Sequence, residues 1–473
     1  MSTNAPSGQE QGAGPGPAAP ARPAWKRWLA LLSLLLTGLL WFNGLVDSFD
    51  RPTVGNALQL RQLELVALAA PALPAALQEP LGAEQPRQAL RNELERQVNG
   101  AAEPAAAEWQ LQLALLEQQL GDPAVAGKRL SVLAGQAKPE QRPLLEALAA
   151  GERLNPADLD ALARPWPLSP LRRQLLCEQL SRDPERCAQP QQQRAALWRL
   201  LGVNGLPLLL VLVGLVLLGR EVWQCWRRRQ TLLPPLAGPA LDLIDVTLLI
   251  AGGFVVVGEL LTPLLAGPLV TALATGLSRD PALQQGVMVL ALYLALMAGP
   301  LWILRRQLPA GAPPEQRLQW QWRPLASTAG WALSRVLMVL PAVALVGWLV
   351  ERLVGDGGGS NPLLELVLTT RNPVALGCFA FTAIVLAPLF EETLFRGVLL
   401  PALARRWGWA WGLVISALTF SVAHLSLAEL PALAVLGLGL GWLRLRSGRL
   451  GSCVLMHGLW NGLTFVNLVL LAG

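Results

Sequence analysis

Apolar segments of about 20 residues recur along this chain of 473 residues, and they constrain its fold more than any other feature. A helix of that length is long enough to cross the hydrocarbon core of a bilayer. Charged residues make up 15% of the chain, whereas soluble domains usually carry about 25%. The sequence therefore predicts an all-α, polytopic membrane helix bundle with about eight or nine spans. The candidate spans are 26–46, 202–219, 241–264, 286–304, 328–350, 374–404, 409–427, 430–445 and 452–471.

Two N-terminal regions depart from this pattern. Residues 1–25 are rich in Pro, Gly and Ala without an apolar period, which predicts a disordered tail. Residues 47–200 are rich in Gln, Glu, Arg, Ala and Leu at helical spacing and predict an all-helical domain. Within this domain, 109–133 predicts two helices around Gly121, which resemble a single tetratricopeptide-type hairpin. A generic helical bundle is the alternative.

The first apolar segment raises the question of a signal peptide, because basic residues precede it. The apolar run is long, and no small-residue cleavage site of the A-x-A type follows it. We therefore expect an uncleaved transmembrane helix at 26–46. A second span and a basic cytoplasmic linker are expected within 201–240, and the remaining spans within 241–473.

The distribution of arginine predicts how the chain is oriented. Alternate short loops are rich in arginine and the opposite loops are poor in it, so the positive-inside rule predicts a cytoplasmic N-terminus. The domain at 47–200 would then be extracytoplasmic, where Cys177 and Cys187 form a disulfide or remain two free thiols. A net charge of +6 is modest for this length and indicates no nucleic-acid partner. The arginines on the predicted cytoplasmic side are Arg220, Arg227, Arg228, Arg229, Arg305, Arg306, Arg317, Arg323, Arg405, Arg406, Arg444, Arg446 and Arg449.

Three charged residues interrupt the apolar stretch at 374–404, namely Glu391, Glu392 and Arg396. Each charge inside a span costs roughly 2.5–3.5 kcal/mol to insert, so each requires a reason. Glu392 and Arg396 are four residues apart and can pair on one helix face. Glu391 points about 100° away from that face, and a carboxylate without a cationic partner in an apolar environment is suited to proton transfer.

The chain has two histidines, His424 and His457, and both lie in predicted spans. Phe420 precedes the first by one helical turn, and Asn461 follows the second by one turn. A lone intramembrane histidine often only packs through a hydrogen bond, and a Glu–Arg pair can be purely structural. Two glutamates, two histidines and an asparagine in three of the last four spans instead indicate a functional site.

These residues form three short motifs that resemble those of a known family. Glu391 to Arg396 matches E-E-x-x-x-R, Phe420 to His424 matches F-x-x-x-H, and His457 to Asn461 matches H-x-x-x-[ND]. In this order they resemble the CPBP intramembrane proteases, which include the type II CAAX prenyl endopeptidases and bacteriocin-processing or immunity relatives. The resemblance covers roughly residues 240–473.

The resemblance implies a role for each carboxylate and for the first histidine. Glu391 would be the general base that activates water, and Glu392 would be a second essential carboxylate held by Arg396. His424 would position the water, with Phe420 in a supporting role. If the spans were straight, Glu391, His424 and His457 would differ in depth by about 8–15 Å. Their convergence therefore requires a tilt, a kink or shifted span boundaries, and Pro388 offers one kink.

The same resemblance implies that His457 and Asn461 stabilise the oxyanion of the tetrahedral intermediate. Members of the family have been described as metalloproteases and as metal-free glutamate proteases. Glu391, His424 and His457 would be the ligands if a divalent metal such as zinc binds. The cofactor stays undecided, and the preferred mechanism requires no metal.

The sequence thus predicts an intramembrane endopeptidase that uses a glutamate-activated water. Its expected partners are the lipid bilayer, a membrane-embedded or membrane-proximal peptide substrate, and a protein that docks on 47–200. The main alternative is a non-catalytic scaffold or bacteriocin-immunity-type protein. A transporter with a proton relay is a third hypothesis, although the two halves of the chain show no inverted repeat.

Overall fold

The computed structural model describes residues 23–49, 54–79, 84–100, 107–166, 168–183, 187–227, 233, 236–354 and 362–473. These residues fold into helices and loops, with one isolated β-bridge and no strand among them. The all-α class is therefore confirmed. The tail expected at 1–25 lies almost entirely outside the described residues, as does part of the basic linker within 201–240.

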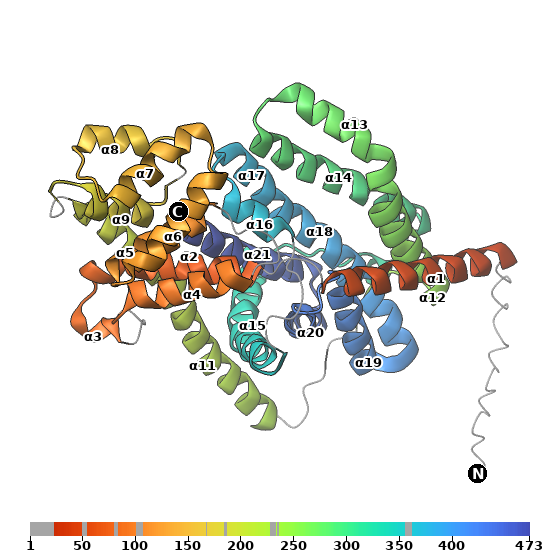
Figure 1. Ribbon diagram of the computed structural model, residues 1–473. Coiled ribbons are helices and arrows are strands. Elements are labelled where there is room, and N and C mark those ends of the chain that lie inside the picture. Colours follow the sequence, from red (N-terminus) through yellow and green to blue (C-terminus); the bar gives the residue numbers. More distant parts are fainter. Residues whose placement is uncertain are drawn as a thin grey trace, which may run out of the picture.

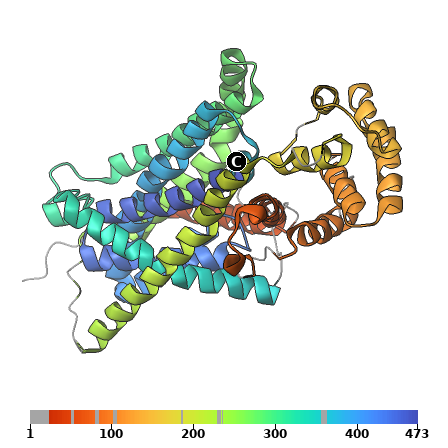
Figure 2. The same cartoon turned by 90° about the vertical axis from the view of Figure 1, so that its left-hand side faces the viewer.

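A domain of short helices lies at one end of the membrane bundle, shown in orange and yellow in Figures 1 and 2. Most of its helices contribute an apolar face to a core made largely of leucine. The predicted hairpin is present, and Gly121 between its two helices has a φ of +99°, a conformation that glycine adopts without strain. The main helices are α2 (Val54–Ala69), α4 (Pro86–Gly100), α5 (Ala107–Gln119), α6 (Pro123–Gln136), α7 (Arg142–Ala150), α8 (Pro156–Ala163), α9 (Pro170–Leu180) and α10 (Pro190–Leu200).

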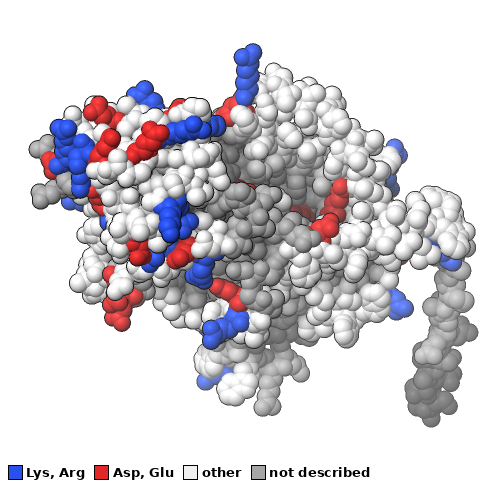
Figure 3. All heavy atoms as spheres, viewed as in Figure 1, with Lys and Arg blue, Asp and Glu red and all other residues white. Residues whose placement is uncertain are grey.

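Cys177 and Cys187 are joined by a disulfide that links α9 to the segment before α10. Of the two states that the sequence left open, the structure has the bridged one. Most charged residues on the face shown in Figure 3 also gather on this helical domain, whereas the membrane part of that face is largely uncharged.

Seven helices of the described residues are long and apolar enough to cross a membrane. The protein is therefore an integral membrane protein. The seven are Ala24–Asp47, Pro190–Gln224, Leu243–Leu277, Pro281–Gln307, Leu325–Leu353, Pro373–Val422 and Leu450–Ala472. In Figure 1 they correspond to α1 (Ala24–Asp47), α11 (Leu206–Arg227), η5 (Leu248–Leu261) with α13 (Thr262–Leu277), α14 (Pro281–Gln307), α15 (Leu325–Val354), α17 to α19 (Pro373–Val422) and α21 (Leu450–Ala472).

The 50-residue run from Pro373 to Val422 is two helices rather than one. Gly408 breaks it with a φ of 83° and a ψ of 162°. Beyond this break the chain turns back, because Ser416 Oγ donates to the carbonyl oxygen of Phe395 at 3.1 Å. The run therefore supplies both of the spans expected at 374–404 and 409–427. The 18-residue helix α20 (Leu430–Ser447) follows them.

Helix α1 is far in sequence from the helices that it contacts. Thr37 Oγ1 donates to the carbonyl oxygen of Ala251 in η5 at 3.3 Å. At the end of α1, the hydroxyl oxygen of Ser48 accepts a hydrogen bond from the backbone N–H of Leu427. The first span is thus packed onto the C-terminal membrane domain, although the whole helical domain separates them in the sequence.

Two π-helical segments interrupt the helix that carries the paired glutamates. The short helix α18 (Ala387–Glu392) lies between η7 (Thr382–Leu386) and η8 (Thr393–Leu399). A π-turn inserts an extra residue into the helix and shifts the direction of the side chains that follow. These segments decide which way the charged residues of the predicted site point.

Candidate active site

Glu392 and Arg396 form a fully buried ion pair in which both side chains are 0% exposed. Arg396 Nη1 donates to Glu392 Oε1 at 2.9 Å. The other Arg396 nitrogen, Nη2, donates to the carbonyl oxygen of Gly437 in α20 at 3.1 Å. The guanidinium also lies 4.3 Å from the centre of the Phe420 ring, a favourable cation–π geometry. This pair holds α18, α19 and α20 together at the site.

Glu391 has a different environment, although it is the adjacent residue. Its side chain is 16% exposed, and its Oε2 atom lies 3.9 Å from His457 Nε2. The hydroxyl of Tyr293, from α14, donates to Glu391 Oε1 at 3.2 Å. Within the described residues, Glu391 Oε2 is buried without a hydrogen-bond partner. It is therefore a carboxylate oxygen available to a water or a substrate.

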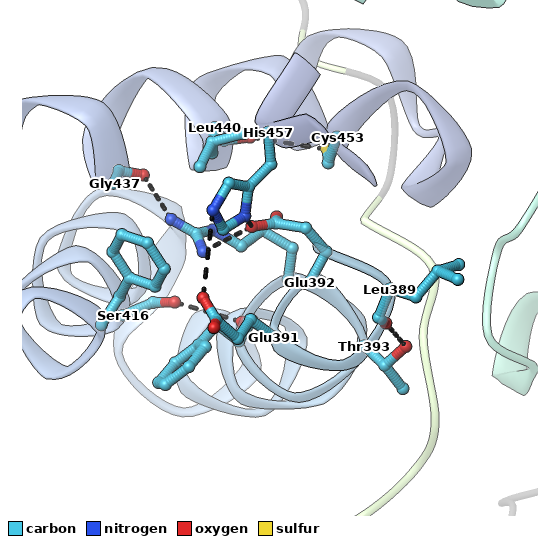
Figure 4. Close-up of polar contacts among 12 residues, drawn as sticks. Leu389, Glu391, Glu392, Thr393, Ser416, Gly437, Leu440, Cys453 and His457 are labelled. Carbon is cyan, nitrogen blue, oxygen red and sulfur yellow. Dashed lines mark hydrogen bonds and ion pairs between the residues drawn. The ribbon is translucent and has the colours of Figure 1, made fainter. Parts of the chain in front are cut away.

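His457 bridges the two glutamates, as Figure 4 shows. It is 3% exposed, and its Nδ1 atom lies 2.9 Å from Glu392 Oε1. Because that oxygen can only accept, Nδ1 is assigned as the protonated nitrogen. The imidazole is thereby fixed with Nε2 directed at Glu391, much as a buried carboxylate orients a catalytic histidine.

His424 contacts this centre through the aromatic ring of Phe420 rather than directly. Its Nδ1 atom is 2.9 Å from the carbonyl oxygen of Phe420. The Phe420 ring packs edge-on against both imidazoles, with centroid distances of 4.8 Å to His424 and 5.7 Å to His457. Phe420 therefore links the second motif to the third by ring packing.

Asn461 contacts the helix backbone beside the glutamates. Its Nδ2 atom donates to the carbonyl oxygen of Ala383 at 2.7 Å, inside the π-helical segment η7. This contact ties α21 to the helix that carries Glu391 and Glu392. The oxyanion role that the resemblance implies for Asn461 stays a prediction.

The sequence placed His457 and the glutamates at different depths in the membrane. In the structure, His457 nevertheless lies within 3.9 Å of both glutamates. The π-helical segments on either side of α18 reorient that helix, and Pro388 lies near the start of α18. The helix therefore contains π-turns on both sides of the glutamates, whereas the kink expected at Pro388 stays a prediction.

Sequence reasoning missed two polar residues beside the site. Tyr293 is the single tyrosine of the chain and lies in a span. Glu259 of η5 is an intramembrane carboxylate whose Oε2 atom accepts a hydrogen bond from Trp41 Nε1 of α1 at 3.2 Å. Glu259 and Tyr293 both interact electrostatically with Glu391. The signal that could have identified Glu259 is its charge within an apolar segment.

The donor set does not fit a zinc site. Among the described residues, no group of three or more His, Cys, Asp or Glu side chains is arranged to hold a metal ion. Glu391, His424 and His457 do not form such a group, and the Phe420 ring packs against both histidines. The mechanism proposed below therefore uses only side chains and water.

Comparison with known proteins identifies two regions of the chain. Residues 373–463 match the family model described as type II CAAX prenyl endopeptidase Rce1-like, and residues 55–198 match a domain of unknown function, DUF8675. An uncharacterized 24.3 kDa protein of Escherichia coli is 44% identical over 81 residues. That similarity covers 16% of this chain and 37% of the relative.

No solved structure matches the chain. All three motifs lie within 373–463, a shorter region than the 240–473 expected from the sequence. The paired glutamates, the two histidines and the asparagine thus all lie within the matched segment, and the two glutamates meet His457 at one buried centre. Residues 373–463 are therefore similar to the type II CAAX prenyl endopeptidase family, which supports the resemblance to the CPBP intramembrane proteases.

Proposed function

We propose that this protein is an intramembrane endopeptidase in which Glu391 activates the water that hydrolyses a peptide bond. One observation carries the proposal: His457 is held by the buried Glu392–Arg396 pair and directs Nε2 toward the open oxygen of Glu391. Adjacent carboxylates in contrasting environments are suited to separate roles in one mechanism.

The charges of this centre balance when His457 carries a proton. The two glutamates then supply two negative charges, and His457 and Arg396 supply two positive ones. A neutral sum lowers the cost of keeping four ionisable groups in an apolar interior. In this state Nε2 has a proton to donate, and Glu391 is free to accept one.

The reaction follows from these two positions. A water that contacts both Glu391 Oε2 and His457 Nε2 fits the 3.9 Å between those atoms. Glu391 takes one proton from the water as the water oxygen bonds to the substrate carbonyl carbon. Nε2–H of His457 donates a hydrogen bond to the resulting oxyanion. Glu391 then returns its proton to the amide nitrogen as the C–N bond breaks, which yields a carboxylic acid and an amine.

The substrate must reach this centre from the membrane or its surface. Figure 3 shows acidic atoms within a hollow of an otherwise largely uncharged face of the membrane part. A membrane-embedded or membrane-proximal peptide is therefore the proposed substrate class. The helical domain at one end of the bundle is proposed to dock a protein partner.

Cleavage of a panel of fluorogenic membrane peptides by the purified full chain tests the proposal. Glu391→Gln keeps the shape of the side chain and removes the base, so the rate should fall by about 10²- to 10⁴-fold. Glu221→Gln is the matched control. It removes a carboxylate that pairs with Arg335 and Arg446 at 3.1 Å and 3.6 Å, outside the site.

Chelator provides the second arm of the test, and activity should persist in its presence. Loss of activity in chelator with recovery in Zn²⁺ would contradict the mechanism and favour a metalloprotease. If the folded protein cleaves no member of the panel but captures a partner equally well with and without Glu391, a non-catalytic scaffold replaces the endopeptidase.

A further inference from the structure

A groove of about 850 Å³ lies between α1, η5 and α14. None of the three catalytic motifs contributes to its lining. Its walls come from the first turns of α1, from the helix that begins at Leu243, and from the last turns of α14. The walls from α1 and η5 lie side by side because α1 packs onto the C-terminal membrane domain.

One end of the groove is polar, and the described residues that line it carry a net positive charge. Lys26 Nζ lies 3.8 Å from Asp245 Oδ1 across this end. The guanidinium of Arg306 lies 5.4 Å from the centre of the Trp302 ring. Among these described residues, two cations face one anion, which leaves room for one further negative charge. Basic and tryptophan side chains together are typical of the level at which phospholipid headgroups lie.

Gln307 supplies a hydrogen-bond acceptor at the same end. Its Nε2 atom donates to the carbonyl oxygen of Asp245 at 2.9 Å. Its Oε1 atom is buried and has no hydrogen-bond partner among the described residues. A buried acceptor is costly unless a donor reaches it. The occupant of the groove should therefore carry a hydroxyl or ammonium group near its negative charge.

The rest of the groove is apolar and runs along the helices. From Lys26 to Ser33 the lining extends about 10 Å along α1, and from Asp245 to Val256 about 16 Å along the neighbouring helix. Leucine, valine and isoleucine side chains form this part of the wall. A molecule that matches both ends is an amphiphile with a compact charged head and a hydrocarbon chain.

We propose that this groove binds one glycerophospholipid with an anionic headgroup that bears a hydroxyl, with phosphatidylglycerol as the representative. Its phosphate lies between Lys26 and Arg306, and its headgroup hydroxyl donates to Gln307 Oε1. One acyl chain follows the apolar wall past Val256. The lipid's charge offsets the excess positive charge of the polar end.

Native mass spectrometry of the purified full chain, titrated with phosphatidylglycerol or phosphatidylcholine, tests this assignment. Phosphatidylglycerol should bind more tightly, because choline offers no hydrogen-bond donor and its lipid has no net charge. The double variant Lys26→Ala/Arg306→Ala should bind phosphatidylglycerol about 30-fold more weakly. Arg227→Ala is the matched control, because Arg227 lies 4.4 Å from the Trp223 ring in α11 but does not line this groove.

A second variant separates a built site from simple attraction to charge. Val256→Trp fills the apolar part and leaves every charge in place, so it should also weaken binding. Equal binding of the two lipids, or equal loss in the Arg227→Ala control, would overturn the proposal. Unchanged binding in Val256→Trp would show that the acyl chain does not occupy the groove. Preference for a peptide over either lipid would assign the groove to a protein segment.

Discussion

At the scale of single residues, the contrast between Glu391 and Glu392 carries the chemistry. They are neighbours in sequence, but Glu392 is fully buried against Arg396, whereas Glu391 is 16% exposed and faces His457 Nε2. The spacing of four residues between Glu392 and Arg396 made their pairing predictable. The contact of Tyr293 with Glu391 spans 98 residues, and no local pattern could predict it.

Tyr293→Phe tests whether the tyrosine hydroxyl positions the base. The substitution keeps the ring, which packs edge-on against Phe390 at 6.3 Å, and removes only the donor to Glu391. A hydrogen bond to a charged group contributes about 1.5–3 kcal/mol, so kcat should fall about 10- to 100-fold with KM nearly unchanged.

Thermal unfolding distinguishes positioning from a general loss of structure. Tyr293→Phe should unfold at nearly the wild-type temperature, because the ring and its packing against Phe390 remain. A Tyr293→Phe enzyme with wild-type kcat would remove Tyr293 from the site.

At the scale of elements, the site depends on close contact between α21 and the π-helical segment η7. Asn461 donates to Ala383 in η7, and Gly458 lies against the carbonyl oxygen of Ile384, which a Cβ at Gly458 would approach to 2.8 Å. His457 precedes that glycine. The contact between the two backbones therefore sets the distance from the imidazole to the glutamates.

Gly458→Ala should displace α21 from η7 and thereby disrupt the geometry of His457. Overpacking of this kind typically lowers the free energy of unfolding by about 1–3 kcal/mol, and peptide cleavage should fall more steeply than stability. Thermal unfolding and cleavage rates measure the two effects.

Gly462→Ala is the matched control for this change. It lies one turn further along α21, and a Cβ there would remain 3.9 Å from the Ile384 side chain, which is an ordinary contact. If both alanine variants behave alike, close approach at Gly458 is not what positions His457.

At the scale of the whole molecule, two regions of different chemistry share one chain. The charged helical domain contains a disulfide, and disulfides persist in oxidising compartments. The arginine-rich short loops belong to the other side by the positive-inside rule. From these observations we propose an extracytoplasmic helical domain and a cytoplasmic N-terminus.

Cysteine accessibility in intact cells tests this orientation. In a chain whose Cys225 and Cys378 are replaced by serine, Ser131→Cys should react with a membrane-impermeant maleimide from outside. Glu315→Cys, in an exposed loop expected on the cytoplasmic side, should react only after the membrane is opened. The reverse pattern would invert the orientation.

The sequence by itself determined the membrane character, the all-α class and the residues of the three motifs. Long apolar runs can fold only as spanning helices in a bilayer, and charged residues within them are conspicuous because they are costly. The tertiary structure alone decided that His457 meets both glutamates, that Tyr293 contacts Glu391 and that α1 packs beside Glu259. These contacts join residues from 65 to 218 positions apart. They depend on helix packing and π-turns, which arise from the whole bundle rather than from any local stretch of sequence.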